Sequence, residues 1–282
     1  TYVLPLSVNY RGIFYNKRML EKDGYQIPST YAELIQTMQQ IKKAGKLPIV
    51  FADKDSWTIH QGWDAIDMSS RGSQDDFFQN VLNGDAFLYE DSIALDSTRK
   101  FLEIRKYGQK QTVNTGYDEA VKKFANGEAY MFFQGNWAYP MIKKINPDID
   151  LLFMPFPAYH ENQAKVVVKI DATLGVSASC KHLEAVEQFL DYVFSKNVSE
   201  YYADKAGAYS CIKSVDVEDS YAKAFTDSIR SGEFFLEEFA YETEKSDAIN
   251  ALFQNFISSP QRDTEKSFLK ELNDLLIQQK GD

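Results

Sequence analysis

The chain has 282 residues, enough for one large domain or two ordinary ones with a sizeable core. Lys and Arg total 31 against 41 Asp and Glu, so the formal net charge is −10 and the basic footprint expected of a protein that binds nucleic acid or anionic lipid is missing. No apolar stretch approaches the roughly 20 residues that cross a bilayer. Residues 1–5 have neither a basic start nor a signal-like apolar run, so they carry no cellular address.

Cysteine and histidine give no indication of a metal or cofactor. Because Cys180 and Cys211 are the only two cysteines, a framework of several disulfides is excluded and a single disulfide bridge is possible. The three histidines are far apart in sequence, and only His60 has a carboxylate, Asp64, one helical turn away. We therefore predict no metal ligands and no cofactor, and interpret the histidines as surface residues.

The first 52 residues predict a strand, a crossing, a second strand, a helix and a third strand. Residues 4–15 are apolar but are interrupted at 9–12, where the chain is expected to cross. A helix then begins with Ser29 or Thr30 as its cap, and residues 47–52 form the next buried strand. This spacing is typical of a βαβ unit, which requires a parallel sheet with helices on both faces.

The rest of the chain alternates helical patterns with short apolar runs. The helices are expected at 57–70, 76–83, 92–107, 117–126, 183–194, around 201–202, and in several segments from about 220 to 279. The strands are expected at 129–133, 150–155 and 166–179. The sequence therefore predicts an α/β protein.

Residues 124–138 have the most informative order in the chain. Gly127 ends a helix, a short apolar run predicts a buried strand, and Gly135-Asn136 favours a turn immediately before Trp137. Trp137 thus follows a strand end, where its indole is placed for stacking on a sugar ring. The alternative is that Trp137 fills the core beside the turn, which is the usual position of a single tryptophan.

Polar and aromatic side chains recur at the predicted strand ends. In open α/β sheets ligands bind at the carboxyl edge of the strands, so this shared position groups them as a candidate site. Planar polar groups bind sugar hydroxyls and aromatic rings bind the apolar faces of sugars, so the mixture predicts a carbohydrate ligand. Each residue taken singly has an equally good structural explanation. The candidates are Asn9, Tyr10, Arg11, Asp55, Trp57, Asn136, Trp137, Asp171, Tyr241 and Glu242.

Catalytic motifs are absent from the sequence. No nucleophile elbow, Walker loop or dinucleotide fingerprint occurs. The adjacent acids Glu237-Glu238 and Asp75-Asp76 do not by themselves supply two carboxylates facing across a cleft, as a glycosidase requires. We therefore predict that the protein is not an enzyme and assign no catalytic residue.

Taken in order, several segments resemble the family 1 extracellular solute-binding proteins of ABC importers, the group that includes maltose-binding protein. Residues 4–17 resemble the first hinge crossing of the family, and Pro28-Ser29-Thr30-Tyr31-Ala32-Glu33-Leu34 resembles its Pro-x-Thr-Trp-x-Glu-Leu helix start. Residues 124–138 resemble its most recognisable stretch, and Met154-Pro155-Phe156-Pro157 resembles its Pro-x-Pro exit. The resemblance extends over nearly the whole chain.

This resemblance implies a periplasmic-binding-protein-like type II fold of two α/β lobes that close on a ligand by a hinge. Residues 8–170 and 220–282 would form the second, C-terminal lobe. Residues 1–7 and 171–219 would be hinge strands and a remnant of the first lobe, because the family has about a hundred or more residues before the first hinge. The helix bearing Phe189 would then expose an apolar face that is covered by another chain, swapped or poorly ordered.

The function implied is an extracytoplasmic sugar-binding subunit of an ABC importer, located at the cell surface as a lipoprotein or in the periplasm. Its partners would be a carbohydrate and the permease subunits. Trp137 and Trp57 would stack on the sugar, while Asp171, Asn9, Arg11 and Asp55 would bind hydroxyls. Two alternatives remain open: a glycoside-active enzyme using cleft carboxylates such as Asp171 and Glu242, and a sugar-sensing partner of a membrane kinase.

Overall fold

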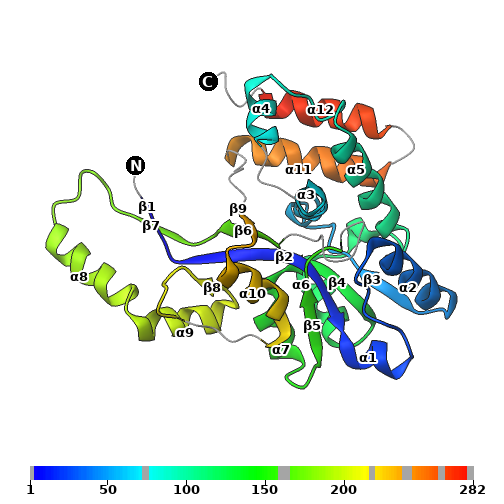
Figure 1. Ribbon diagram of the computed structural model, residues 1–282, viewed down its shortest axis with the longest axis horizontal. Coiled ribbons are helices and arrows are strands. Elements are labelled where there is room, and N and C mark those ends of the chain that lie inside the picture. Colours follow the sequence, from blue (N-terminus) through cyan, green and yellow to red (C-terminus); the bar gives the residue numbers. More distant parts are fainter. Residues whose placement is uncertain are drawn as a thin grey trace.

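The computed structural model describes residues 3–71, 76–157, 166–215, 220–236, 243–259 and 264–277 (Figure 1). Its strands are β1 (Val3–Pro5), β2 (Ser7–Asn16), β3 (Leu47–Val50), β4 (Ala129–Gly135), β5 (Leu151–Met154), β6 (Val166–Ile170), β7 (Thr173–Gly175), β8 (Tyr209–Ser210) and β9 (Phe234–Leu236). Its α-helices are α1 (Lys17–Lys22), α2 (Tyr31–Lys43), α3 (Trp57–Arg71), α4 (Phe77–Asn83), α5 (Ser92–Arg105), α6 (Tyr117–Ala125), α7 (Tyr139–Ile145), α8 (Leu183–Val193), α9 (Lys196–Ala206), α10 (Lys223–Ser231), α11 (Thr243–Ser258) and α12 (Glu265–Ile277). Three short 3₁₀ segments are η1 (Thr112–Asn114), η2 (Asn136–Ala138) and η3 (Ser220–Ala222).

A seven-stranded sheet is organised around β2. The path of the sheet is β3-β4-β2-β6-β9, and β5 and β8 also pair with β2. β2 is long enough to pair with β4 and β5 through its second half and with β6 and β8 through its first half. The sheet is therefore mixed, because β4, β5, β6 and β8 all run antiparallel to β2, while β3 runs parallel to β4.

Two features of the predicted sheet are wrong. The break expected at residues 9–12 does not occur, because β2 runs unbroken through them. Gly12 permits this close pairing, since a Cβ at that position would lie 2.1 Å from the carbonyl oxygen of Met154. The first predicted βαβ unit also fails, because β4 lies between β2 and β3 and reverses the direction of β2 relative to β3. Apolar periodicity identifies a strand but not its partner.

Residues that begin or end helices are easier to recognise in the sequence than the pairing of strands. Thr30 caps α2 through a capping box with Glu33, and Asn16 caps α1 by accepting a hydrogen bond from the backbone of Met19 at 3.1 Å. Gly207 ends α9 in the left-handed conformation. α12 lies within the stretch where the sequence predicts helices, and it has a buried apolar stripe of Phe268, Leu269, Leu272 and Leu276. β9 differs from the expectation, because the sequence predicts only helices from about residue 220 onward.

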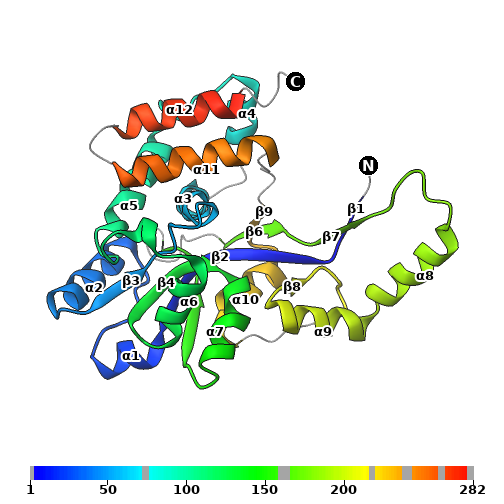
Figure 2. The ribbon, with the colours of Figure 1, turned by 180° about the vertical axis from the view of Figure 1, so that it is seen from behind.

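The hydrophobic core forms two layers, one on each face of the sheet (Figures 1 and 2). One layer joins Ile13 and Phe133 of the sheet to α2, α3, α5, α11 and α12. The other joins Phe14 and Phe132 to α6, α7 and α10. Successive residues of one strand thus point to opposite faces, and both faces are covered by helices as the α/β prediction requires.

Residues 171–215 do not pack as one unit: their first part stands apart from the main sheet and α9 packs inward. β7 pairs with β1 in a separate two-stranded sheet, and α8 contains no buried residue. Figure 1 shows α8 projecting away from the main body. The following α9 does pack inward, because Ser199 and Ala203 are buried. Phe189 of α8 is 55% exposed and Tyr192 is 66% exposed, so the predicted exposure of an apolar helix face is confirmed.

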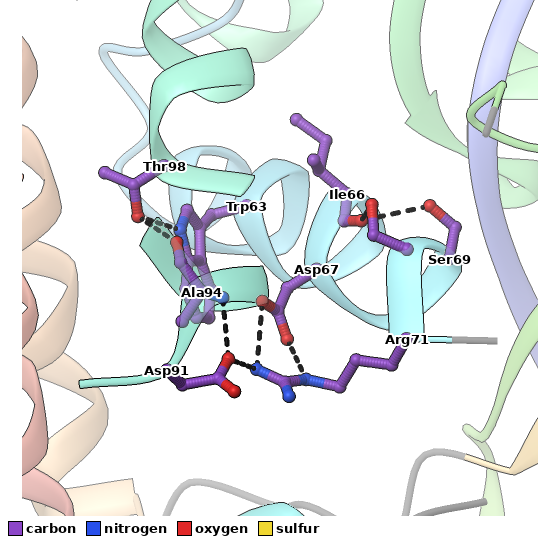
Figure 3. A network of polar contacts seen from close by, with 9 residues as sticks. Trp63, Ile66, Asp67, Ser69, Arg71, Asp91, Ala94 and Thr98 are labelled. Atoms are coloured by element: carbon purple, nitrogen blue, oxygen red, sulfur yellow. Dashed lines mark hydrogen bonds and ion pairs between the residues drawn. The ribbon is translucent and has the colours of Figure 1, made fainter. Parts of the chain in front are cut away.

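A buried ionic network joins α3 to α5 (Figure 3). Arg71 at the end of α3 contacts both carboxylate oxygens of Asp67 at 2.6 and 3.2 Å, and also contacts Asp91 at 2.8 Å. Asp91 in turn caps α5 by accepting a hydrogen bond from the backbone of Ala94 at 2.7 Å. The Trp63 indole donates to Thr98 on α5 at 2.9 Å. These contacts fix α3, the helix that begins at the candidate site.

Candidate functional site

The sheet register brings the predicted polar segments together at one edge. Arg11 lies opposite Gly135, so residues 9–11 at the start of β2 are beside the residues that follow β4. β3 runs parallel to β4, and its carboxyl end therefore reaches the same edge and leads into residues 53–57. The sequence argument from strand ends is supported here, although β2 contributes its amino half rather than its carboxyl end.

Trp137 lies in η2, immediately after β4, and is partly exposed. Its ring lies against Gly135, where an added Cβ would be 2.1 Å from the indole atom Cζ3. Gly135 therefore allows the indole to lie flat on the strand end, where a side chain would displace it. The indole nitrogen is buried and has no hydrogen-bond partner among the described residues. The indole is thus neither a fully buried core plug nor an isolated surface ring.

Trp57, the first residue of α3, lies beside Trp137 with ring centroids 6.2 Å apart and planes inclined at 50°. Trp57 also contacts Tyr117, the first residue of α6, with ring centroids 5.2 Å apart. We call Trp137, Trp57 and Tyr117 the aromatic row. The sequence predicts both tryptophans at strand ends but does not single out Tyr117, which falls at the start of the helix expected at 117–126. The signal for Tyr117 was its position at the start of a helix directly after Gly116.

Asp55 holds the end of the aromatic row in place. One of its carboxylate oxygens accepts a hydrogen bond from the backbone of Tyr117 at 2.5 Å, so the negative charge lies at the amino end of α6, where the helix dipole favours it. Burial raises the pKa of the Tyr117 phenol, which therefore stays neutral at physiological pH. Asp55 is half-buried and thus combines a structural contact with a position at the site.

The side chains of two predicted site residues, Asn136 and Tyr10, make structural contacts inside the protein. Asn136 is fully buried; its amide accepts from the backbone of Tyr10 at 2.9 Å and donates to the carbonyl of Gly207 at 2.6 Å and to Asn9 at 3.3 Å. Tyr10 is 1% exposed and stacks on Phe225 at 4.4 Å. Asn136 therefore joins β2, η2 and the end of α9, and the Tyr10 ring belongs to the core.

The remaining predicted residues surround this edge. Arg11 is buried and forms an ion pair with Asp64 of α3 at 3.5 Å, which joins β2 to α3. Asn9 is half-buried, and Asp171 is exposed after β6, with its backbone N–H donating to the carbonyl of Ser7 at 3.0 Å. Tyr241 and Glu242 lie outside the described residues.

The described residues contain no cluster of three or more His, Cys, Asp or Glu side chains arranged to hold a metal ion. His60, which was expected at the surface, is instead buried at 8% exposure and contacts Asn250 at 2.6 Å. Cys180 and Cys211 are both free thiols, and burial raises the pKa of Cys211. No helix in the described part of the chain has the length and apolarity needed to cross a bilayer.

Solved structures of ligand-binding proteins share this fold. RafE in complex with raffinose superposes with a TM-score of 0.83 at 22% sequence identity, covering 99% of this chain and 73% of RafE. A sugar transporter protein from Bacillus licheniformis in complex with stachyose gives a TM-score of 0.77 at 20% identity, covering 98% of this chain and 74% of its own. The type II binding-protein fold expected from the resemblance is thereby confirmed.

The sequence itself matches the family described as bacterial extracellular solute-binding protein over residues 1–199, and the chain belongs to this family. The Multiple sugar-binding protein of Streptococcus mutans is 29% identical over 222 residues, which cover 76% of this chain and 52% of that protein. The Melibiose/raffinose/stachyose-binding protein MelE of Bacillus subtilis is 20% identical over 230 residues, covering 79% and 54%. The chain spans about half the length of the curated relatives it matches.

Proposed function

We propose that the chain is the ligand-binding part of an extracytoplasmic solute-binding subunit of an ABC importer and that its ligand is a sugar or oligosaccharide. The observation that carries this proposal is the aromatic row at the sheet edge, with Asp55 hydrogen-bonded to the backbone of Tyr117 and Arg11 opposite Gly135 in the sheet. Aromatic faces and fixed polar groups together match the alternating C–H faces and hydroxyls of a pyranose. The names of the relatives point to the same ligand class.

In this proposal Trp137 and Trp57 stack on sugar faces, and Asp55, Asn9, Arg11 and Asp171 serve the hydroxyls. Asn136 fixes, through its hydrogen bonds, the strands that carry these residues, and the Tyr10 ring packs in the core next to this sheet edge. The permease subunits are the partners, binding is not followed by chemical conversion, and the protein acts outside the cytoplasm, as a lipoprotein or in the periplasm. A sensing role toward a membrane kinase would use the same site.

The first test removes the stacking ring. Trp137→Ala in the full-length protein should weaken sugar binding by about 1–3 kcal/mol, the usual loss for a central aromatic contact. Isothermal titration calorimetry with melibiose, raffinose, stachyose and a wider sugar panel measures it. Tyr201→Ala is the control, because Tyr201 is an aromatic side chain on α9 that is 66% exposed. Equal sugar affinity of Trp137→Ala and wild type would contradict the stacking role. The appearance of shorter sugars during incubation would favour the alternative of a glycoside-active enzyme.

We further propose that β1, β7 and α8 belong to a first lobe, while residues 8–170 and 220–282 form the second. The burial of Ser199 and Ala203 in α9, against no buried residue in α8, supports assigning α9 to the second lobe rather than to the remnant, which would put the boundary within 171–219 near Ser195. The exposed apolar side chains of α8 support this division, because Leu183, Phe189 and Tyr192 are all more than half exposed. An apolar helix face of this kind normally packs against another element.

The α8 face should make the 282-residue chain self-associate. Replacing Phe189 and Tyr192 together by Ser should shift the chain toward the monomer, because association of this face is driven by burial of apolar surface. Sedimentation velocity over a range of protein concentrations measures the shift. Replacing Ser177 and Ser179, exposed serines of the preceding loop, by Ala is the control. Wild-type chain that stays monomeric at every concentration would contradict this role.

A further inference from the structure

The loop that joins β3 to α3, residues 51–56, carries Asp55 and leads directly into Trp57. Its last part is tied to α3, because the carbonyl of Ala52 accepts hydrogen bonds from the backbone of Asp55 and from the hydroxyl of Thr58, both at 3.1 Å. These contacts shape the turn but do not fix it relative to the rest of the protein. The position of the loop therefore depends on groups that other elements bring to it.

Two glutamine side chains bind the backbone of this loop. The amide of Gln109 accepts a hydrogen bond from the backbone N–H of Phe51 at 3.1 Å and donates one to its carbonyl at 2.6 Å. Gln254 of α11 donates to the carbonyl of Asp53 at 3.1 Å. The loop is thus held at its first residue and again two residues later, by segments far from it in the sequence.

The third anchor is an ion pair with α5. Arg105, the last residue of α5, lies 3.2 Å from one carboxylate oxygen of Asp53, and both side chains are almost fully buried. The Arg105 guanidinium also lies over the rings of Phe101 and Phe51, at 3.8 and 4.6 Å from their centroids. Because Phe51 and Asp53 both belong to the loop, Arg105 contacts the loop at two points.

The Asp53 carboxylate needs this partner. Its second oxygen is buried and has no hydrogen-bond partner within the described ranges. Without Arg105 the carboxylate would remain buried and unpaired, which is costly enough to drive it toward water. A shift of Asp53 would displace Trp57 four residues later, and with it the ring contact that Trp57 makes with Trp137 at 6.2 Å.

We propose that Arg105 is a positioning residue of the sugar site: its contacts with Asp53 and Phe51 set the loop, and the loop sets the Trp57 ring against the ligand. The inference rests on the proposed sugar-binding function. It adds to that function a residue of α5, outside the predicted site residues, on which sugar affinity depends. Arg105 acts in this way through Trp57 rather than by touching the sugar.

The experiment is a double-mutant cycle in the full-length protein, measured by calorimetry with melibiose, raffinose and stachyose. Arg105→Met should weaken sugar binding at least fivefold in the wild-type background. In the Trp57→Ala background the same substitution should weaken binding less than twofold, because no indole is left to be placed. A loss that is equally large in both backgrounds overturns the positioning role.

Lys100→Met is the matched control. Lys100 is a buried cation of the same helix that pairs with Asp96 at 2.8 Å and lies over the Tyr31 ring at 5.3 Å. Both substitutions remove a buried cation beside an aromatic ring, so both should lower the temperature of thermal unfolding. Lys100→Met should nevertheless keep sugar affinity within twofold of wild type. An Arg105→Met affinity no weaker than that of the control overturns the inference and leaves sugar binding intact.

Tryptophan fluorescence of the sugar-free protein tests the same coupling without a ligand. Arg105→Met should shift the emission spectrum, and most of the shift should disappear when Trp57 is replaced by Phe. A shift of the same size in both backgrounds contradicts the coupling. If Arg105→Met does not fold, Arg105→Lys takes its place in every measurement and should give smaller effects of the same kind, because lysine keeps a cation for Asp53 without the planar fork. Absence of binding for every sugar in the wider panel contradicts the proposed function itself.

Discussion

Arg71→Met should lower the free energy of unfolding by about 3–5 kcal/mol, the cost of leaving a buried charge without its partner. The Arg71 side chain is 4% exposed and the Asp67 side chain is 0% exposed, so neither group can turn to solvent when the other is removed. The Arg71 guanidinium also lies over the rings of Phe77 and Phe78, at 4.0 and 5.2 Å from their centroids, and methionine removes this cation–π contact while filling part of the space. The loss therefore combines the unpaired charge of Asp67 with the lost cation–π contact.

The pH dependence of this variant follows from Asp67. Burial raises the pKa of Asp67, and the Arg71 guanidinium acts in the opposite direction. Without Arg71 the pKa in the folded protein rises further above its value in the unfolded chain, so folding favours the protonated acid. Stability of Arg71→Met should thus be greatest below the unfolded pKa and should fall as pH rises toward the folded pKa.

Urea unfolding at pH 5 and pH 8 measures both effects. Lys196→Met is the matched control, because Lys196 forms an exposed ion pair with Glu200 at 3.6 Å, a type of pair that contributes only about 0–1 kcal/mol. A stability loss in Arg71→Met no larger than that of the control would contradict the network's role in fixing α3. A loss of the expected size that did not diminish at pH 5 would contradict the assignment of the remaining charge to Asp67.

Asn136→Ala should lower the free energy of unfolding by about 2–4 kcal/mol. The substitution leaves a buried backbone N–H and a buried carbonyl without their hydrogen-bond partner. The N–H is that of Tyr10 on β2 and the carbonyl is that of Gly207 at the end of α9. Gly207 has little room to adjust, since an added Cβ there would lie 2.7 Å from the Pro140 ring. The variant should therefore loosen α9 from the sheet edge.

Hydrogen exchange of residues 199–210 and thermal unfolding measure this effect. Asn114→Ala, an exposed asparagine bonded to Gln111 at 3.0 Å, is the control and should change stability by no more than about 0.5 kcal/mol. Sugar affinity of the folded variant separates the two roles considered for Asn136. Unchanged stability with weakened sugar binding would show a direct ligand contact and contradict the structural one.

The sequence predicted local features well where one residue decides them. Thr30 with Glu33, and Gly127 and Gly207 at helix ends, fix helix boundaries through hydrogen bonds within a few residues. The position of Trp137 just past a strand was predicted in the same way and is confirmed. Partners across the sheet were not predictable, because the pairing of β3 with β4 depends on chain segments almost eighty residues apart.

The candidate site shows the same division. Sequence analysis placed Trp57 and Trp137 at strand ends, but their 6.2 Å contact follows from the order of β3 and β4 in the sheet. Tyr117 was missed because a tyrosine at a helix start is ordinary until Asp55, sixty-two positions earlier, is seen to hold it. Asn136 was assigned to ligand binding because its type and position suit that role, whereas its burial and its three partners are visible only in three dimensions.

The amino-acid sequence by itself determined most of the helices, the caps and ends of several of them, the α/β class and the family resemblance, because each depends on neighbours within a few turns or on overall composition. Tertiary structure decided which strands are neighbours, how β2 serves both halves of the sheet, and which polar side chains are left for a ligand. These depend on long-range packing, where a side chain's role is set by the partners that the fold brings to it.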